Sequence, residues 1–190
     1  LKISGSAAII GGGNVAMDAA RCAKRMGAEH VYVLYRRDEE EMPARKEEVH
    51  HAKEEGIEFM LLTNPVKVLD DGTGRVGGLE CVKMRLTAPD ESGRRAPKVV
   101  EGSNFTLEVD TVVMSLGTSP NPLIRSTTPG LETNRKGCLQ VDEETMATSR
   151  PGVYAGGDAV TGAATVILAM GAGKKAAESM HQYLQEKHSK

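Results

Sequence analysis

The chain has 190 residues, of which 39% are hydrophobic, enough for one ordinary domain or two small lobes with a buried core. Its 24 basic and 26 acidic residues give a net charge of −2, so no overall positive field would attract nucleic acid or an anionic membrane surface. Two Phe, four Tyr and no Trp also argue against a base-stacking surface for single-stranded nucleic acid. Any anion-binding site must therefore be local.

The three cysteines, Cys22, Cys81 and Cys138, form neither a CxxC redox pair nor a zinc-ligand pattern, which indicates a reduced, cytoplasmic setting. The longest apolar run, residues 163–170, is too short to cross a bilayer core of about 30 Å. No charged and apolar leader opens the sequence, and the start at Leu1 rather than Met suggests a processed or engineered fragment. We therefore expect a cytoplasmic protein that binds neither membranes nor nucleic acid.

The first third of the sequence predicts a βαβ unit. Residues 6–10 form a short apolar strand, residues 14–26 form a helix that ends at Gly27, and residues 31–35 form a second strand. The crossover in such a unit is nearly always right-handed.

A parallel sheet with an antiparallel insertion is predicted for the rest of this domain. Pro43 suits the first turn of a helix that continues to residue 55, and residues 57–62 form a third strand. Three further strand-like segments separated by turns indicate the antiparallel excursion: residues 66–69, 78–86 and 105–109. Residues 111–116 then return to the parallel sheet. The fold class is therefore α/β, with a Rossmann-like nucleotide-binding domain.

The remainder of the sequence makes a poor independent core. It holds two short strand candidates, residues 138–141 and 153–154, and one helix over residues 162–186. We therefore predict two domains, residues 1–116 and residues 117–190, of which the second is incomplete.

A glycine-rich turn follows the first strand. Its spacing is Gly11-x-Gly13-x-x-Ala16, and Asn14 and Val15 open the helix behind it. Gly11 permits the tight turn, and Gly13 lets a pyrophosphate approach backbone N–H groups at the helix N-terminus. The alternative is a tight strand-to-helix connection without a ligand. The strand–turn–helix–strand setting favours dinucleotide binding.

The end of the second strand carries the residue that reads the adenosine ribose in dinucleotide-binding folds. An acid there accepts from the 2′-OH of NAD, whereas arginine pairs with the 2′-phosphate of NADP. Arg36 and Arg37 occupy this place, and Arg45, expected in the first turn of the next helix, is placed to add a third contact. The alternative is a solvated arginine pair that faces the acidic residues 38–41. The position favours NADP(H) as the cofactor.

A second candidate nucleotide site lies near the C-terminus. Residues 153–155 lead into Gly156-Gly157-Asp158, and a helix begins near Ala164 with small or apolar residues in its first turns. A helix N-terminus without side-chain charge suits an electron-rich flavin carbonyl. An ordinary turn before a core helix has the same pattern, so the residues alone leave both interpretations open.

Two motifs resemble those of flavoproteins with two dinucleotide-binding domains, the pyridine nucleotide-disulfide oxidoreductase-like proteins: SLGTSPN at residues 115–121 and GVYAGGDAVTG at residues 152–162. Three longer segments are similar, more narrowly, to the NADPH-dependent glutamate synthase small (beta) subunit and its relatives, which include electron-bifurcating transhydrogenase and dihydropyrimidine dehydrogenase modules. They read GGGNVAMDAARCAKRMGA, VLYRRDEEEMPARKEEVHHAKEEGIEF and ATVILAMGAGKKAA. The similarity runs over almost the whole chain.

The resemblance implies roles for residues of the second domain. In that family Asp158, beside Gly157, would hydrogen-bond the ribityl or pyrophosphate region of FAD, and Thr165 and Val166 would present backbone N–H groups to the isoalloxazine ring. Gly117 would lie where the chain crosses between the two nucleotide domains. The NADPH domain of the family is inserted within the FAD domain, so the second domain would be the C-terminal piece of an FAD-binding domain.

The resemblance also implies a reaction, namely hydride transfer from NADPH C4 to flavin N5. Electrons would then pass to iron–sulfur clusters elsewhere in the intact protein or in a partner, such as the large glutamate synthase subunit of glutamate biosynthesis. Hydride transfer needs positioning more than acid–base chemistry, so we assign no catalytic and no metal-binding residue. Two alternatives are a thioredoxin-reductase-like protein, against which the missing CxxC argues, and a non-catalytic NADP(H)-binding sensor or interaction module.

The sequence departs from the family in two respects. It contains neither the first FAD fingerprint, a glycine-rich turn near the N-terminus, nor the cysteine clusters that bind iron–sulfur centres. We therefore expect this chain to bind NADPH, to hold FAD weakly and to be inactive without the missing FAD-domain segment and a redox partner. The apolar face of the helix at residues 164–177 would lack its usual sheet, so we expect it to pack on the NADPH-binding domain or on another copy of the chain, which favours a homo-oligomer.

Overall fold

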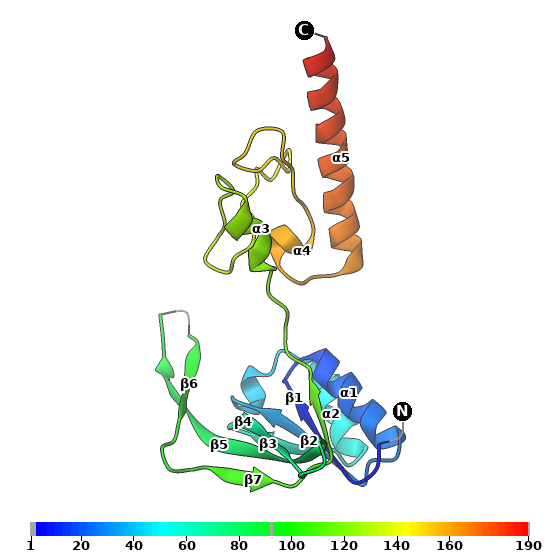
Figure 1. Cartoon of the computed structure of the whole chain (residues 1–190), viewed down its shortest axis with the longest axis vertical. Coiled ribbons are helices and arrows are strands. Elements are labelled where there is room, and N and C mark those ends of the chain that lie inside the picture. Colours follow the sequence, from blue (N-terminus) through cyan, green and yellow to red (C-terminus); the bar gives the residue numbers. More distant parts are fainter. Residues whose placement is uncertain (1–2, 92, 190) are drawn as a thin grey trace. The chain divides into compact units, whose positions relative to one another are not determined.

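The computed structural model describes residues 3–91 and 93–189. The chain divides into two compact units, Leu1–Leu116 and Gly117–Lys190, each with its own internal packing (Figure 1). Within the described residues, none of the helices combines the length and the apolar character needed to cross a membrane.

The first unit is built on a parallel sheet with the strand order β3-β2-β1-β8. Its strands are β1 (Ser6–Ile10), β2 (His30–Tyr35), β3 (Glu58–Leu61) and β8 (Thr111–Met114). Two helices cross between these strands, α1 (Asn14–Arg25) and α2 (Lys46–Glu54). This arrangement confirms the predicted α/β fold class.

Both faces of the parallel sheet are covered, because successive side chains of a strand point to opposite faces. Ala7 and Ile9 of β1 pack with buried residues of α1 and α2. Ala8 and Ile10 pack instead with buried residues of the antiparallel strands, such as Leu79. Helices therefore cover one face, and the antiparallel sheet covers the other.

The antiparallel excursion predicted from the sequence is present between β3 and β8. Its strands are β4 (Thr63–Asp70), β5 (Val76–Pro89), β6 (Arg95–Val99) and β7 (Phe105–Leu107). The long strand β5 pairs with all three of the others. The sequence did not predict β6, because its residues RAPKV show no clear alternation of apolar and polar side chains.

The helix expected from Pro43 begins later, at Lys46. A short 3-10 turn, η1 (Glu39–Glu41), precedes it, and Asp38 and Glu41 form a reciprocal capping box around this turn. Met42 is then extended, with φ −67° and ψ 126°. The capped turn thus delays the helix.

Among its described residues, the second unit holds three helices, α3 (Pro122–Thr127), α4 (Asp158–Thr161) and α5 (Val166–His188). The strands expected at residues 138–141 and 153–154 are isolated bridges, in which Val141 pairs with Thr148 and Ala147 with Tyr154. The sequence predicted α5 from residue 162, but Gly162 has a φ of +80° and Thr165 caps the helix. The part of this unit between α3 and α4 therefore consists of loops and isolated bridges.

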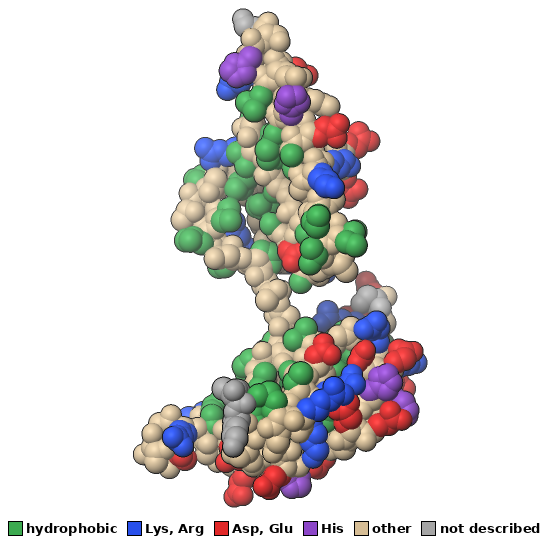
Figure 2. Space-filling view, turned by 90° about the vertical axis from the view of Figure 1, so that its right-hand side faces the viewer, with side chains coloured by type: hydrophobic (Ala, Val, Ile, Leu, Met, Phe, Trp, Pro, Cys, Tyr) green, Lys and Arg blue, Asp and Glu red, His purple; other side chains and the backbone are tan. Residues whose placement is uncertain are grey.

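Helix α5 leaves much of its apolar surface open within its unit. Among its residues Ala176 is buried, whereas Val166, Ile167 and Leu168 are 63–80% exposed. The face of this unit seen in Figure 2 carries many hydrophobic side chains. Exposed apolar surface of this kind is typical of a surface that contacts another chain or segment.

An ion-pair network joins α1 to the end of α2. Glu55 accepts hydrogen bonds from Arg25 Nη2 at 2.6 Å and from Arg21 Nε at 2.8 Å. These bonds, first from Arg25 and then from Arg21, lower the pKa of Glu55 below its ordinary value. A carboxylate whose pKa is lowered in the folded state stabilises the fold above its unfolded pKa and loses this effect as the pH falls.

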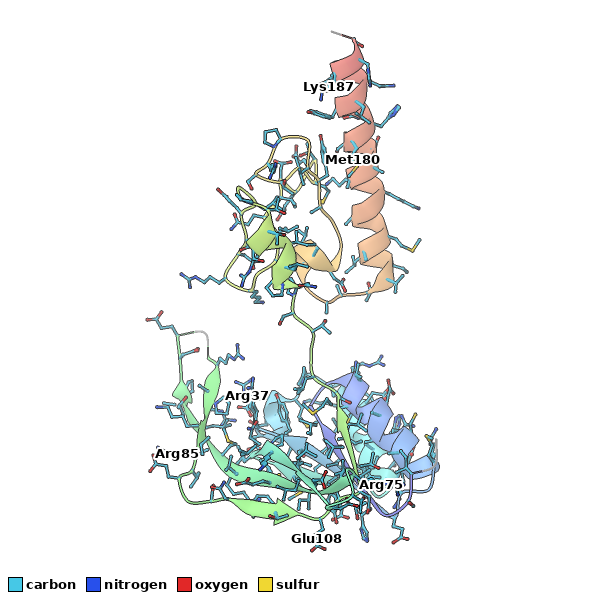
Figure 3. All side chains as sticks on the ribbon, viewed as in Figure 1. Arg37, Arg75, Arg85, Glu108, Met180 and Lys187 are labelled. Carbon is cyan, nitrogen blue, oxygen red and sulfur yellow. The ribbon has the colours of Figure 1, made fainter. Side chains whose placement is uncertain are left out.

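We expect Glu55→Gln to lower the free energy of unfolding at neutral pH, and we expect this deficit to be smaller at about pH 3, because the effect is lost as the pH falls below the unfolded pKa of about 4.3 and through the lowered pKa of the folded state. Urea unfolding at both pH values measures this. Glu108, an exposed carboxylate labelled in Figure 3 and without an ion pair to another described residue, provides the matched control Glu108→Gln. An equal deficit of the Glu55 variant at both pH values would contradict the assignment.

The three thiols differ in access. Cys81 in β5 is fully buried, Cys138 is 2% exposed, and Cys22 on α1 is exposed. Burial raises the pKa of the Cys81 thiol to about 11. The thiolate is the reactive form, so Cys81 should be unreactive at neutral pH, both because its side chain is buried and because its pKa is raised.

We expect iodoacetamide to label Cys22 rapidly in the native protein, and to label Cys81 and Cys138 only after unfolding. Peptide mass spectrometry of samples alkylated with and without urea identifies the labelled positions. Rapid labelling of Cys81 in the native protein would show that β5 opens readily.

Candidate functional site

The three consecutive positions after β1 are glycine for different structural reasons. A Cβ on Gly11, whose φ is +148°, would lie 2.3 Å from the carbonyl oxygen of Ser115. A Cβ on Gly12 would lie 2.6 Å from the ring of Tyr35. A Cβ on Gly13 would meet its nearest atom, in Pro43, at 4.0 Å. The first two glycines are therefore required by internal packing, whereas only Gly13 borders open space.

Gly13 is also the N-cap of α1. Its carbonyl oxygen accepts from the N–H groups of Ala16 and Met17 at 2.9 and 3.2 Å. The first N–H groups of a helix, here those of Asn14 and Val15, have no acceptor within the helix, and the first turn carries no acidic residue. Such a helix start favours an anion such as a pyrophosphate.

The segment before α2 is attached to this turn. Ala44 N donates to Gly12 O at 3.0 Å, and Arg45 N donates to Asn14 Oδ1 at 2.9 Å. The sequence predicted Arg45 in the first turn of this helix, but Arg45 is the N-cap of α2, which begins at Lys46. Its guanidinium is exposed, with Glu48 Oε1 at 3.4 Å. The structure therefore brings Arg45 next to the glycine turn through its backbone.

Arg36 and Arg37 follow β2 and lie in different surroundings. Arg36 is exposed, whereas Arg37 is half-buried and donates from Nε and Nη2 to the carbonyl oxygen of Arg95, the first residue of β6 (Figure 3). Ion pairs to the acidic residues that follow come from other cations, which are Lys53 to Glu39 and Arg95 to Glu40 and Glu41. No ion pair joins Arg36 or Arg37 to these acids within the described chain, so these acids do not offset the charge of either arginine.

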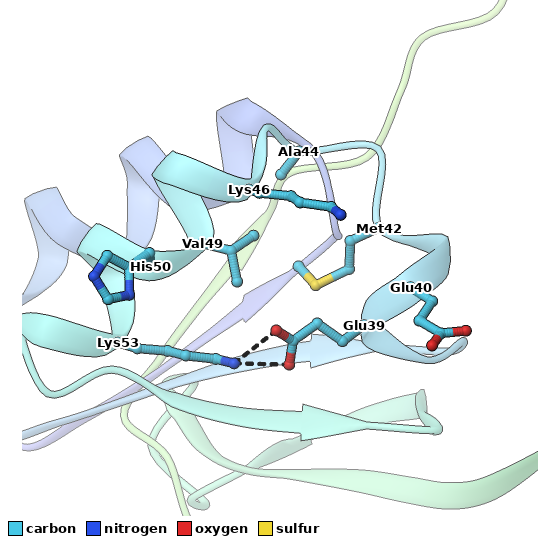
Figure 4. Close-up of a pocket in the computed structure, with 8 residues that line it drawn as sticks. All are labelled: Glu39, Glu40, Met42, Ala44, Lys46, Val49, His50 and Lys53. Carbon is cyan, nitrogen blue, oxygen red and sulfur yellow. Dashed lines mark hydrogen bonds and ion pairs between the residues drawn. The ribbon is translucent and has the colours of Figure 1, made fainter.

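A cavity of about 610 Å³ lies between η1 and α2 of the first unit (Figure 4). Met42, Ala44 and Val49 supply apolar surface, and Lys46 and His50 add polar groups. The Nζ of Lys53 is 2.7 Å from both carboxylate oxygens of Glu39. The cavity therefore adjoins the segment that is attached to the glycine turn.

In the second unit, Gly156 and Gly157 approach helix α5 closely. A Cβ on Gly156 would lie 3.1 Å from Ala172, and one on Gly157 would lie 3.3 Å from Ala169 Cβ. Gly157 also has a φ of +69°. The small residues of the turn and of the helix therefore serve close packing, which is one reason for the glycine–alanine pattern in the sequence.

Asp158 follows this turn and orders the loop before α5. Its Oδ1 accepts from Ala164 N at 3.3 Å, and Thr165 Oγ1 accepts from Leu168 N at 3.5 Å. Val166 is the first residue of α5. The structure thus places Asp158, Thr165 and Val166 around one loop.

Asp158 also lines a cavity of about 290 Å³ in the second unit, together with residues of the 118–125 segment. Gly117, expected where the chain crosses between domains, is exposed and begins the second unit. This cavity and the exposed start of α5 offer space for a ligand in the second unit.

Three residues near the arginines were not identified from the sequence: Tyr35, Glu41 and Arg95. Tyr35 packs on Gly12, and its hydroxyl donates to Glu41 O at 2.8 Å. Arg95 Nε donates to Glu41 Oε1 at 2.6 Å. Arg95 lies 54 residues after Glu41, and no local pattern indicates this pairing.

Comparisons with known proteins agree with this geometry. A family model described as pyridine nucleotide-disulphide oxidoreductase matches residues 2–176. The NADP(+)-dependent formate dehydrogenase subunit beta of Moorella thermoacetica is 45% identical over 179 residues, which cover 94% of this chain and 25% of that protein. The glutamate synthase (NADPH) small chain of Azospirillum brasilense is 42% identical over 180 residues, which cover 94% of this chain and 37% of that protein.

The fold is similar to that of a solved thioredoxin reductase from T. acidophilum, with a TM-score of 0.71 and 24% identity, over 95% of this chain and 52% of that one. The chain spans well under half the length of the two sequence relatives. The resemblance to the glutamate synthase small chain, first seen in the motifs, is confirmed by these identities. Because the family model matches most of its residues, the chain belongs to the pyridine nucleotide-disulphide oxidoreductase family.

Proposed function

We propose that this chain is the NADPH-binding part of a flavin oxidoreductase and also supplies one portion of its FAD site. The observation that carries the proposal is the start of α1, where Gly13 opens onto free space and where the next strand is followed by Arg36 and Arg37. A pyrophosphate at the helix start and a 2′-phosphate at the arginines are the two anionic groups of NADPH.

Selectivity for NADPH follows from the charges near the end of β2. Arg36 is exposed, and the acidic residues behind it are paired with Lys53 and Arg95. A guanidinium pairs with a phosphate through charge-assisted hydrogen bonds, which are stronger than bonds to a neutral ribose hydroxyl. Arg45 is placed near the glycine turn and would add a further positive charge.

The second unit offers the types of chemical group that an FAD site needs. The cavity beside Asp158 and the exposed start of α5 at Thr165 and Val166 provide a carboxylate and helix N–H groups next to open space. When bound, FAD would supply the two-electron acceptor for the hydride of NADPH. Asp158 would orient the ribityl or pyrophosphate region, and the N–H groups at the start of α5 would favour electron density on the ring. A sensor that binds only NADP(H) would not require these residues.

We further propose that a larger assembly contains this chain. Two of its relatives, from Moorella thermoacetica and Azospirillum brasilense, are named as a subunit beta and as a small chain. Helix α5 also exposes an apolar surface that suits another segment or subunit. A missing FAD-domain segment and a large redox subunit with iron–sulfur clusters, as in glutamate synthase, are the partners that we infer. The reductive biosynthesis of glutamate in the cytoplasm is the process that we consider first, because it matches the motif resemblance.

We expect Gly13→Ala to keep the fold and to weaken NADPH binding about tenfold, because the added methyl group occupies the space that the pyrophosphate needs. Gly11→Ala is expected to destabilise the fold by more than about 1 kcal/mol, because its Cβ meets a backbone oxygen and its φ is strained. Thermal unfolding and calorimetric titration of both variants separate these effects. Unchanged NADPH affinity in Gly13→Ala would place the pyrophosphate elsewhere.

We expect the protein to bind NADPH at least tenfold more tightly than NADH, and we expect Arg36→Ala to remove most of this difference. Each charge-assisted hydrogen bond contributes about 1.5 to 3 kcal/mol, and the preference should weaken as salt rises. Calorimetric titration of both cofactors tests this. Arg85→Ala, at an exposed arginine of β5 without an ion pair to another described residue, is the matched control (Figure 3). Equal affinity for the two cofactors would remove the assignment.

A further inference from the structure

Arg95 connects the antiparallel strands to the loop that follows β2. Its Nε donates to Glu41 Oε1 at 2.6 Å, and its Nη2 forms ion pairs with the same carboxylate and, at 3.8 Å, with Glu40. Its own carbonyl oxygen accepts both hydrogen bonds from Arg37. One residue of β6 therefore contacts the loop through its side chain and its backbone together.

The same loop is held from the other side by the glycine turn. The Tyr35 ring packs on Gly12, and the Tyr35 hydroxyl donates to Glu41 O at 2.8 Å. Glu41 also closes the capping box, since its Oε2 accepts from Asp38 N at 3.1 Å. The loop over residues 36–41 is thus fixed between the glycine turn and β6, with Glu41 at the point where both sets of contacts meet.

The charges in this loop make Arg95 important for an anionic ligand. Three consecutive glutamates, residues 39–41, follow Arg36 and Arg37, the arginines of the proposed 2′-phosphate site. Lys53 pairs with Glu39, and Arg95 pairs with the other two. The Glu41 side chain is 15% exposed and that of Arg95 is 33% exposed, so solvent screens this pair less than a surface pair. Without Arg95, unpaired negative charge would lie beside a doubly charged phosphate.

We propose that Arg95 is a positioning residue for NADP(H) selectivity. It holds Arg37 and the loop after β2 in place and offsets the glutamates that would otherwise repel the 2′-phosphate. This inference rests on the proposed function, and it assigns a role in cofactor choice to the β5–β6 hairpin, which lies outside the βαβ unit that carries the glycine turn.

The test compares Arg95→Met with Arg94→Met, which removes the same charge from the neighbouring exposed arginine that has no ion pair to another described residue. Calorimetric titration gives the dissociation constants for NADPH and NADH. We expect Arg95→Met to weaken NADPH binding about tenfold with little change for NADH, because only NADPH carries the phosphate that the unpaired glutamates repel. We expect Arg94→Met to leave both constants unchanged.

A second variant separates the electrostatic role from simple support of the fold. Adding Glu41→Gln to Arg95→Met removes the unpaired charge while keeping a side chain that can complete the capping box, so it should restore part of the NADPH preference. An equal loss of affinity for both cofactors would reduce Arg95 to structural support and overturn the inference. If the unmodified protein prefers NADPH and Arg95→Met keeps the same preference, the role of Arg95 is wrong while the proposed function still stands. If the unmodified protein shows no preference, the proposed function itself is wrong.

Discussion

A side chain at residue 11 or 12 would collide with atoms that the fold has already placed there. The carbonyl oxygen of Ser115, just after β8, lies against Gly11, and the ring of Tyr35, at the end of β2, lies against Gly12. The turn after β1 is therefore compressed between the ends of its two neighbouring strands. This packing leaves Gly13 and the helix start as the part of the turn that a ligand can reach, and the proposed nucleotide site depends on it.

Charge compensation keeps the loop over residues 36–41, next to the glycine turn, suitable for an anionic ligand. Glutamates 39–41 would weaken an anion site if they were unpaired, but Lys53 and Arg95 pair with them, and Arg36 stays exposed. The cations come from α2 and from β6, and both of these elements follow the loop in the sequence. The local field at the end of β2 is therefore set by the tertiary structure, although the net charge of the chain is −2.

The second unit follows another principle, which is close backbone approach through small residues. The Gly156–Gly157 turn packs on Ala169 and Ala172 of α5, while several larger side chains of this helix stay exposed. Asp158 then fixes the loop that leads into the helix. The helix start is therefore ordered, and the exposed side chains of α5 leave apolar surface available to another segment or chain.

The sequence by itself determined the βαβ unit, the glycine turn and the arginines at the end of β2, because these depend on local periodicity and on residue types at short spacing. It also determined the antiparallel excursion, though without β6, whose residues carry no clear apolar alternation. Only the tertiary structure decided the start of α2 at Lys46, the reason for Gly12 and the contacts of Arg95. Gly12 and Arg95 depend on contacts between segments far apart in the chain, which leave no local pattern in the sequence. The start of α2 depends on the capping box of Asp38 and Glu41, whose spacing is local but competes with the helix signal of Pro43.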